Sequence, residues 1–301
     1  MTGVLRIQGL VFCGFGLLLT VACTGLVHVA EQTELIVAAA LILLLGVPHG
    51  ALDMIFAQKL HRIETKLGWA YFGLAYGALA AAVIAVWSFA PVAFLIGFLV
   101  ISAGHFSGDP APGTRTISRV VYGGAVIVLP ALLHSGEVSR LFAMLAGPDA
   151  SALLKPWLTQ AAWPWLGALI VCSAIEARRS WQTSLELLTV GGLMTLAPPL
   201  IGFAAFFCGM HSARHILRTI TYSRPMAPWM VLASGLIPMV IVFAGAVSGW
   251  QFLGGVSFDE RLVQLVFVGI AALTVPHMAL IERVRFSGWS SPEVSPPLPA
   301  R

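Results

Sequence analysis

Charged side chains are scarce in this sequence. They make up 10% of the 301 residues, against 58% hydrophobic ones, and the mean hydropathy is +0.90. Soluble domains carry roughly 25% charged residues, so this composition excludes a soluble protein. The apolar runs approach the roughly 20 residues that a helix needs to cross a bilayer, and they lack the alternation of barrel strands. The sequence therefore predicts an all-α integral membrane protein.

Paired cysteines and basic clusters are also missing. Cys13, Cys23, Cys172 and Cys208 fall in apolar runs without paired spacing, which excludes a disulfide framework and predicts small buried side chains. The net charge is +4, but the basic residues are scattered in short loops and form no patch, so nucleic acid is not expected as a partner. The sequence also has no repeat of fixed period and no low-complexity tract.

Ten apolar segments follow one another along the chain. They cover approximately residues 9–29, 35–56, 68–89, 91–108, 119–134, 157–176, 184–197, 199–220, 229–249 and 261–281. The segment 184–197 is short for a span, and merging it with the next segment leaves eight. We therefore expect a polytopic bundle of 8–10 transmembrane helices, with residues 1–289 as one catalytic membrane domain and residues 290–301 as a disordered cytoplasmic tail.

The distribution of basic residues predicts the orientation. With the N-terminus in the cytoplasm, only Arg140, Lys155 and Arg261 fall on the outer side, and the other fourteen of the 17 Lys and Arg residues fall on the inner side. This bias follows the positive-inside rule and places both termini in the cytoplasm. A multi-pass protein of the inner (plasma) membrane is expected.

Five of the eight histidines lie inside apolar segments, on helices that run from the outer to the inner side. They are His49, His105, His211, His215 and His277. All five fall in the cytoplasmic half at roughly one depth, and ionisable residues inside a membrane usually face the bundle interior and mark a functional site. The four-residue spacing of His211 and His215 stacks both rings on one helical face, as a metal requires.

This set of imidazoles predicts a metal site in the cytoplasmic half of the membrane. An all-imidazole set suits iron, zinc, copper or nickel. Asp53 and Asp109 each follow a histidine by four residues, so either carboxylate can orient the other N–H of that ring across one helical turn. The alternatives are that Asp109 ends a helix before Pro110 and that Asp53 is an interfacial charge.

Several motifs resemble one known family. Pro48-His49-Gly50-Ala51-Leu52-Asp53, the element from His105 to Asp109, His211-Ser212-Ala213-Arg214-His215 and Pro276-His277-Met278 are together similar to the Brp/Blh family of membrane-bound β-carotene 15,15′-dioxygenases. The resemblance covers about residues 46 to 280. It implies cleavage of the central double bond of β-carotene with O2 to two retinal molecules, at an Fe(II) site inside the membrane. The first span precedes the motifs and is expected to be peripheral.

The resemblance also implies roles for individual residues. The iron ligands are His49, His105, His211 and His215. His277 has a supporting or pocket role, and Asp53 and His277 are the candidate catalytic residues. An apolar tunnel for the carotenoid is expected, with membrane lipid around the protein and no particular oligomeric state indicated. The tunnel candidates, each of which also suits ordinary helix packing, are Met54, Phe106, Phe203, Phe206, Phe207 and Met210.

Three other functions compete with this interpretation. A two-metal lipid desaturase or hydroxylase requires roughly eight histidines, and only five are placed for it. A b-type haem electron carrier pairs histidines across helices, which one-sided placement permits for a single haem. A metal or proton transporter requires acids and histidines along a whole path, whereas the outer half of these helices has no acid or histidine candidate.

Overall fold

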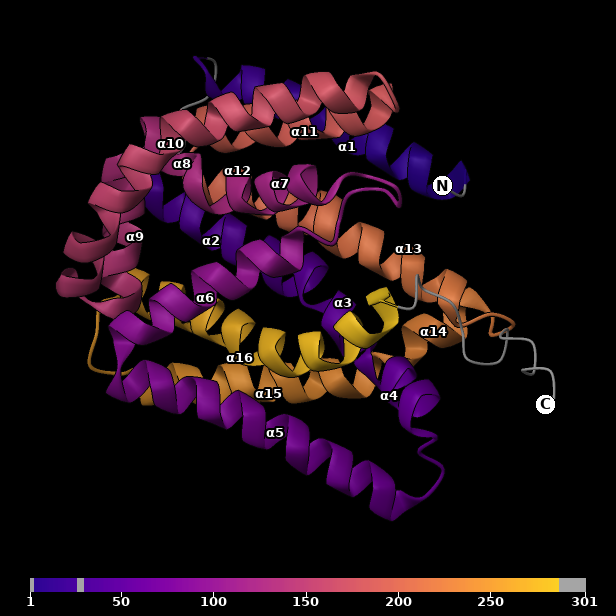
Figure 1. Cartoon of the computed structure of the whole chain (residues 1–301). Coiled ribbons are helices and arrows are strands. Elements are labelled where there is room, and N and C mark those ends of the chain that lie inside the picture. The colour runs from indigo at the N-terminus through magenta and orange to yellow at the C-terminus, as the bar shows by residue number, and fades with distance from the viewer. Residues whose placement is uncertain (1–2, 26–29, 287–301) are drawn as a thin grey trace.

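A computed structural model describes residues 3–25 and 30–286, and all regular secondary structure in these two ranges is helical (Figure 1). The first elements are α1 (Gly3–Cys23), α2 (Glu31–Leu41), the π-helical segment η1 (Ile42–Gly46), α3 (Pro48–Ala51), α4 (Asp53–His61), α5 (Lys66–Phe89), α6 (Pro91–Phe106), α7 (Thr116–Val128) and α8 (Pro130–Leu133). The others are α9 (Ser135–Ala146), α10 (Pro148–Ala177), α11 (Trp181–Leu196), α12 (Pro199–Phe206), the π-helical segment η2 (Phe207–Ser212), α13 (Ala213–Tyr222), α14 (Pro228–Ser234), α15 (Leu236–Phe252) and α16 (Phe258–Phe286). The predicted all-α fold is confirmed, and the tail predicted at residues 290–301 lies outside the described residues.

Eight helical stretches in the described part are long and apolar enough to cross a membrane. One of them runs from α2 through η1, α3 and α4, and another runs from α12 through η2 and α13. The helix α6 is a shorter apolar helix, and α11 has 16 residues, most of them buried. The predicted bundle of 8–10 spans is confirmed, while its division into domains and the side of the membrane on which the termini lie stay predictions.

Proline begins many of these helices. It lies in the first turn of α3, α6, α8, α10, α12 and α14, where its missing N–H removes no intrahelical bond and its fixed φ suits the helix. Pro238 lies in the first turn of α15 as well, and three prolines lie farther inside helices: Pro156 and Pro164 in α10, and Pro276 in α16. A proline there interrupts the hydrogen-bond ladder, and in α16 the interruption falls directly before His277.

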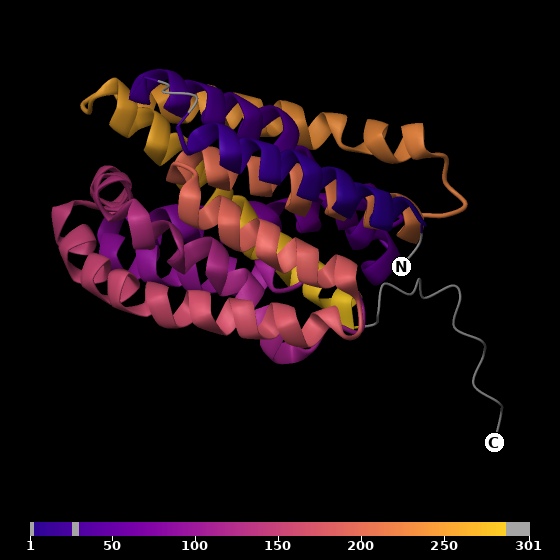
Figure 2. The same ribbon diagram turned by 90° about the horizontal axis from the view of Figure 1, so that it is seen from above.

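The helices form a thick bundle with an interior layer (Figures 1 and 2). One side is made by α1, α10 and α11, with α11 packed against both of the others. The opposite side is made by α5 and α15. Between them lie α2, α6, α7, α12 and α16, with contacts of α16 to α2 and of α6 to α7. The interior layer therefore collects segments that are far apart in the sequence.

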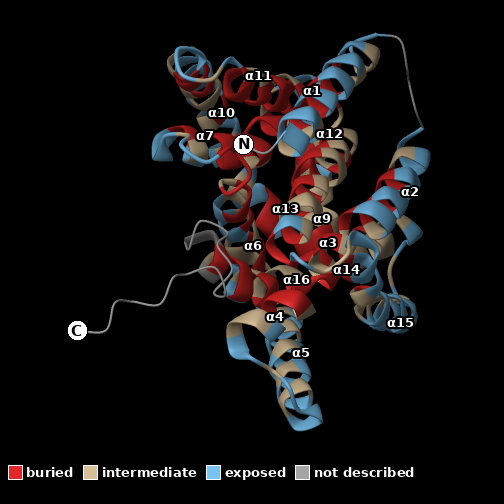
Figure 3. Cartoon of the chain, turned by 90° about the vertical axis from the view of Figure 1, so that its right-hand side faces the viewer, coloured by how far each residue is buried: buried red, intermediate tan, exposed pale blue. Residues whose placement is uncertain are grey.

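The outer helices expose apolar surface. Neither α5 nor α15 has a buried residue, although both are strongly apolar (Figure 3). Phe89 and Phe252 are about nine-tenths exposed. In a membrane such a surface faces lipid, where a helix satisfies its own backbone polar groups. The buried side chains gather instead along the interior layer, which includes α12, α13 and parts of α16.

Two polar contacts join segments that were predicted for the same side of the membrane. Arg140 of α9 forms an ion pair with Glu31 at the start of α2. At the other end of the bundle, Lys59 Nζ donates to the backbone carbonyl of Tyr222 over 3.2 Å. The alternation of helix direction that was predicted from the basic residues is therefore consistent with both contacts.

The first span was expected to be peripheral, and α1 does lie on one side of the bundle, but one of its faces is packed against the protein. The helix α1 packs along α11 and contacts η2 and α13. Its residues Gly9, Phe12, Cys13 and Gly16 are buried in these contacts. Because α1 carries no sequence motif, its contacts with the interior layer could not be predicted from the sequence.

Candidate metal centre

Most of the five intramembrane histidines lie at irregularities in their helices. His49 follows the π-helical segment η1, His211 lies within η2, and His277 follows Pro276. His105 is the second-last residue of α6, and His215 is in the first turn of α13. Local π-helical turns recur at functional sites because they redirect side chains out of the regular helical pattern.

The five imidazoles form one buried cluster. The ring centroid of His49 lies 4.9 Å from that of His211, 5.3 Å from His215 and 5.1 Å from His277. The ring of His105 lies 4.6 Å from His211 and 5.2 Å from His277. Each side chain is at most 7% exposed. The structure thus brings together all the histidines that the sequence placed at one depth.

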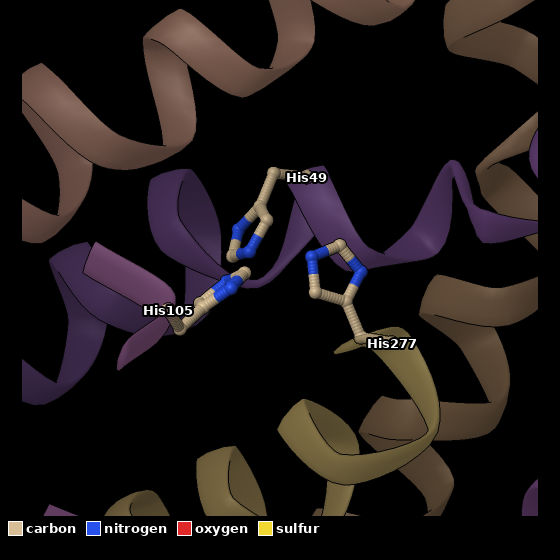
Figure 4. A group of neighbouring side chains, drawn as sticks. All are labelled: His49, His105 and His277. Carbon is tan, nitrogen blue, oxygen red and sulfur yellow. The ribbon is translucent and has the colours of Figure 1, made fainter. Parts of the chain in front are cut away.

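His277 lies within this cluster. One ring nitrogen each of His49, His105 and His277 lies within 4.8 Å of the others (Figure 4). Figure 4 shows the three rings turned toward a common centre from three different segments. Nitrogen ligands about 2.1 Å from a tetrahedrally coordinated ion are spaced about 3–4 Å apart, so this group is close to a coordinating arrangement. His277 therefore stands beside the expected ligands, and its supporting role stays a prediction.

The outward-facing nitrogen of His49 is held by the backbone. Its Nδ1 lies 2.5 Å from the carbonyl oxygen of Gly46 and 3.0 Å from Ser212 Oγ. The Ser212 hydroxyl itself donates to the Gly46 carbonyl over 3.0 Å. A ring fixed at Nδ1 in this way presents Nε2 to the centre of the cluster, which is the usual support for a metal-binding histidine.

Two carboxylates hold two further rings. Asp109 lies with both carboxylate oxygens 3.0 Å from His211 Nδ1. Asp53 Oδ1 lies 2.7 Å from His277 Nδ1, while its Oδ2 accepts a hydrogen bond from the Tyr76 hydroxyl over 3.0 Å. Each carboxylate is buried, with 3% or 4% exposure. These are carboxylate–histidine pairs of the kind that orient metal ligands.

The predicted partners of these carboxylates were wrong. The sequence offered orientation of His49 by Asp53 and of His105 by Asp109, each across one helical turn, beside the alternatives of a helix end at Asp109 and an interfacial charge at Asp53. The helix is interrupted at Leu52, whose ψ is 1°, and α6 ends before Asp109. Neither pair therefore lies on one continuous helix, and each carboxylate meets a histidine from another helix, Asp53 that of His277 and Asp109 that of His211.

The pair His211 and His215 also differs from a simple helical stack. Their ring centroids are 6.4 Å apart with an interplanar angle of 42°. The segment η2 ends at Ser212, between the two histidines, so the first ring is displaced from regular α-helical geometry. Both rings nevertheless contact His49, which keeps them in the same cluster.

The Nε2 atoms of the cluster are suited to bind a cation. The Nε2 atoms of His211 and His277 are buried and have no hydrogen-bond partner among the described residues. Burying such a polar atom without a partner is costly. A metal ion satisfies both lone pairs, because the Nδ1 atoms already engage carboxylates. The all-imidazole donor set suits iron, zinc, copper or nickel, so the residues fit a metal of this class.

Replacing Asp109 with asparagine tests this arrangement. The Asp109→Asn side chain keeps its shape but loses the charge that faces His211 Nδ1, so the affinity of the purified protein for cobalt(II) is expected to fall about 10–100-fold. Asp149→Asn, at an exposed carboxylate, provides the matched control. Equal affinities for the two variants would show that the carboxylate does not support the site.

Aromatic side chains close the cluster on one side. Phe207 stacks on His211 with centroids 5.5 Å apart and contacts His49, and Phe106 lies 5.0 Å from His211. Phe206 and Met210 are fully buried in the core. Of the tunnel candidates, Phe106 and Phe207 therefore wall the histidines, and Phe206 and Met210 are packed within the core.

An apolar cavity of about 100 Å³ lies between α6, α7, α9, α12 and α16. Phe203 is in its wall, whereas the half-buried Met54 of α4 is not. Ser102 also lines it and lies one helical turn before His105. Phe203 stacks on Phe207, which in turn stacks on His211. The cavity is thus connected to the histidine cluster through adjoining side chains.

Several residues of the site were not found from the sequence. Tyr76 supports Asp53, and Ser212 supports His49. Arg214 and Glu186 form a buried ion pair near Asp109. An ionisable pair inside apolar segments is itself a signal of function, and Glu186 opposite Arg214 was available to that argument.

Comparison with known proteins gives consistent matches. A model of the family described as beta-carotene 15,15′-dioxygenase matches residues 40–284. The chain is 31% identical over 267 residues to the beta-carotene 15,15′-dioxygenase of an uncultured marine bacterium, 66A03, covering 81% of this chain and 92% of that protein. It is 24% identical over 288 residues to the probable beta-carotene 15,15′-dioxygenase Blh of Halobacterium salinarum, covering 82% of each. No solved structure matches the chain.

Proposed function

Because the chain belongs to the β-carotene 15,15′-dioxygenase family, we propose that it cleaves the central double bond of β-carotene with O2 and releases two molecules of retinal. The observation that carries this proposal is the convergence of five buried imidazoles on one centre inside an apolar bundle. In this reaction both oxygen atoms of O2 enter the products, one in each retinal, so no outside reductant is required.

We propose iron(II) as the metal, held by His49, His105, His211 and His215. We propose His277 as a further ligand of the same centre, because one of its ring nitrogens groups with those of His49 and His105. The donor set and the unpartnered inward nitrogens support a metal of this class. Iron bound there supplies the binding and activation of O2. The protein holds the rings through Asp53, Asp109 and the Gly46 carbonyl. The aromatic rings of Phe106 and Phe207 pack against His211.

The substrate enters most readily from lipid. A C40 hydrocarbon partitions into the bilayer, and a site inside the bundle avoids its transfer through water. We propose that the cavity beside Ser102 and Phe203 takes up one end of the polyene and so sets the distance of the central bond from the histidines. Its volume is below the roughly 300–1,000 Å³ of most ligand pockets. Phe203 and Phe267 in its wall therefore have to move on binding.

Filling this cavity tests that assignment. The Ser102→Phe side chain occupies space in the cavity and is expected to lower the initial rate of retinal formation at least about tenfold while the bound metal is retained, because a misplaced bond reacts slowly. Ser102→Ala leaves the space open and is expected to stay active. Rates are measured by chromatography with matched amounts of protein. A wild-type rate for Ser102→Phe would exclude this cavity as a substrate site.

The geometry of the cluster also argues against two of the competing functions. Imidazole centroids 4.6–5.3 Å apart across segments leave no room for a haem macrocycle between those rings, and the wider His211–His215 pair, at 6.4 Å, comes from one continuous helical stretch. A two-metal desaturase requires roughly eight histidines, and among the described residues His61 is exposed while His134 pairs with Glu137 away from the cluster. The remaining histidine, His28, lies outside the described residues. A single metal centre is therefore the better-supported reading.

We further propose that the protein lies in the plasma membrane with this centre in the cytoplasmic half, as the basic residues predict. Expression in a bacterium that accumulates β-carotene tests the proposed activity. Retinal is expected to appear as the carotene disappears. Unchanged carotene in cells whose membranes contain the protein would contradict the proposal.

A further inference from the structure

The helix α1 lies outside residues 40–284, which the family model matches, yet it contacts the segment that carries His211. The contact is made by Gln8. Its Nε2 donates to the carbonyl of Gly209 within η2 over 2.8 Å, and its Oε1 accepts from Arg214 Nε over 2.9 Å. Gln8 thus connects the turn before His211 to the residue three positions after it.

Arg214 is held on its other side by a buried carboxylate. Its Nη1 donates to Glu186 Oε2 over 2.9 Å and its Nη2 to Glu186 Oε1 over 2.7 Å. Both residues are 1% exposed. A buried pair of this kind needs good geometry and additional hydrogen bonds to offset desolvation, and Gln8 supplies one of those bonds.

The same arginine reaches the segment that carries Asp109. Arg214 Nη1 donates to the Asp109 carbonyl over 3.1 Å, and Arg218 Nη2 donates to that oxygen over 2.8 Å. The carboxylate of Asp109 in turn faces His211 Nδ1. Gln8 is therefore connected to His211 by two routes, one through Gly209 and one through Arg214 and Asp109.

The backbone of α1 is closely fitted to this pair. A Cβ atom added to Gly9 would overlap Glu186 Oε1 and would lie 2.8 Å from Arg214 Nη2. Glycine at this position lets the helix approach closely enough for Gln8 to reach Arg214. The fit of Gly9 is independent of the hydrogen bonds of Gln8 and indicates the same contact.

We propose that Gln8 is a positioning residue, which fixes His211 by tying Arg214 to the Gly209 carbonyl. The role rests on the proposed function, since His211 is there a metal ligand. Gln8 does not touch the metal or the substrate. It limits the movement of the η2 turn and of Asp109, and a chain without this bond holds the His211 ring less rigidly.

The test compares two glutamine substitutions in the purified full chain. Gln8→Met keeps the size of the side chain and removes its hydrogen bonds with Gly209, Arg214 and Met210. Gln251→Met makes the same change at an exposed position in α15. Cobalt(II) is titrated into each metal-free protein, and its visible absorption reports ligand geometry. For Gln8→Met, we expect about tenfold weaker cobalt binding and shifted absorption bands, the lower end of the range for outer partners of metal ligands.

A second variant separates positioning from folding. Gln8→Glu keeps the acceptor for Arg214 Nε but loses the donor to the Gly209 carbonyl, so its cobalt spectrum is expected to lie between those of the wild type and Gln8→Met. A cobalt spectrum of Gln8→Met that lies nearer to the wild type than that of Gln8→Glu would overturn the assignment. Identical spectra and affinities for Gln8→Met and Gln251→Met would overturn it as well. Retinal formation by the unchanged chain is measured separately, so failure of the proposed activity is distinguished from failure of the role of Gln8.

Discussion

The variant in which His211 and His215 are both replaced by alanine is expected to form no detectable retinal. The substitution removes two adjacent imidazoles from the cluster, and loss of a mere outer partner already costs about 10–100-fold in metal affinity or activity. Both rings contact His49, so the double variant removes two of the imidazoles that adjoin this ring. Retinoids are quantified by chromatography from cells that accumulate β-carotene.

The matched control for this variant replaces two histidines outside the cluster. His61 is exposed, and His134 pairs with Glu137 in a partly exposed position, so His61→Ala with His134→Ala makes the same chemical change elsewhere. The control is expected to produce retinal at the wild-type level. Equal amounts of each protein in the membrane are verified before comparison. Retinal at the wild-type level from the His211→Ala, His215→Ala variant would contradict the proposed ligands.

Replacing His277 with alanine is expected to reduce the bound iron as strongly as replacing His49. The ring of His277 lies 5.1 Å from His49 and 5.2 Å from His105, and its Nε2 has no partner in the described part of the chain. Loss of this ring also leaves the carboxylate of Asp53 without its histidine. Iron per protein is expected to fall to about a tenth or less, the scale for changes around a metal.

The iron content of the purified variant distinguishes a ligand role of His277 from the supporting role that the resemblance implies. A residue that only lines the substrate pocket changes the rate and leaves the iron content of the purified protein unchanged. His134→Ala is the control, since His134 lies outside the cluster. Full iron content in His277→Ala, together with slower retinal formation, would assign His277 to the pocket and not to the metal.

The sequence was most informative where one residue type was rare. An ionisable histidine inside an apolar run is costly, so five of them at one depth predict a shared site, and the structure brings the five rings together. The helical fold followed from the apolar runs in the same way. Both predictions depend on composition and on distance along a helix, which a sequence contains directly.

Predictions that depended on local helix geometry were less accurate. The partners of Asp53 and Asp109 were wrong because Leu52 interrupts one helix and α6 ends before Asp109. The π-helical segments η1 and η2 likewise carry no recognisable sequence signal. A four-residue spacing is reliable only within an unbroken helix, and these helices are interrupted next to the site.

Contacts between distant segments were beyond the sequence altogether. The helix α1 has no motif of the family, and the role of Gln8 appears only when its contacts with Gly209 and Arg214 are seen. The tunnel candidates show the same limit, since Phe203 lines the cavity while Phe206 is packed in the core. Both are aromatic residues of one apolar helix, and only tertiary packing separates them.

The most direct measurement uses the purified protein freed of metal, supplied with β-carotene and O2, with and without added iron(II). We expect retinal only in the sample with iron, at two molecules for each β-carotene consumed and without longer or shorter cleavage products. Equal retinal formation without iron, or products of unequal length, would contradict an iron centre that places the central double bond at the histidine cluster.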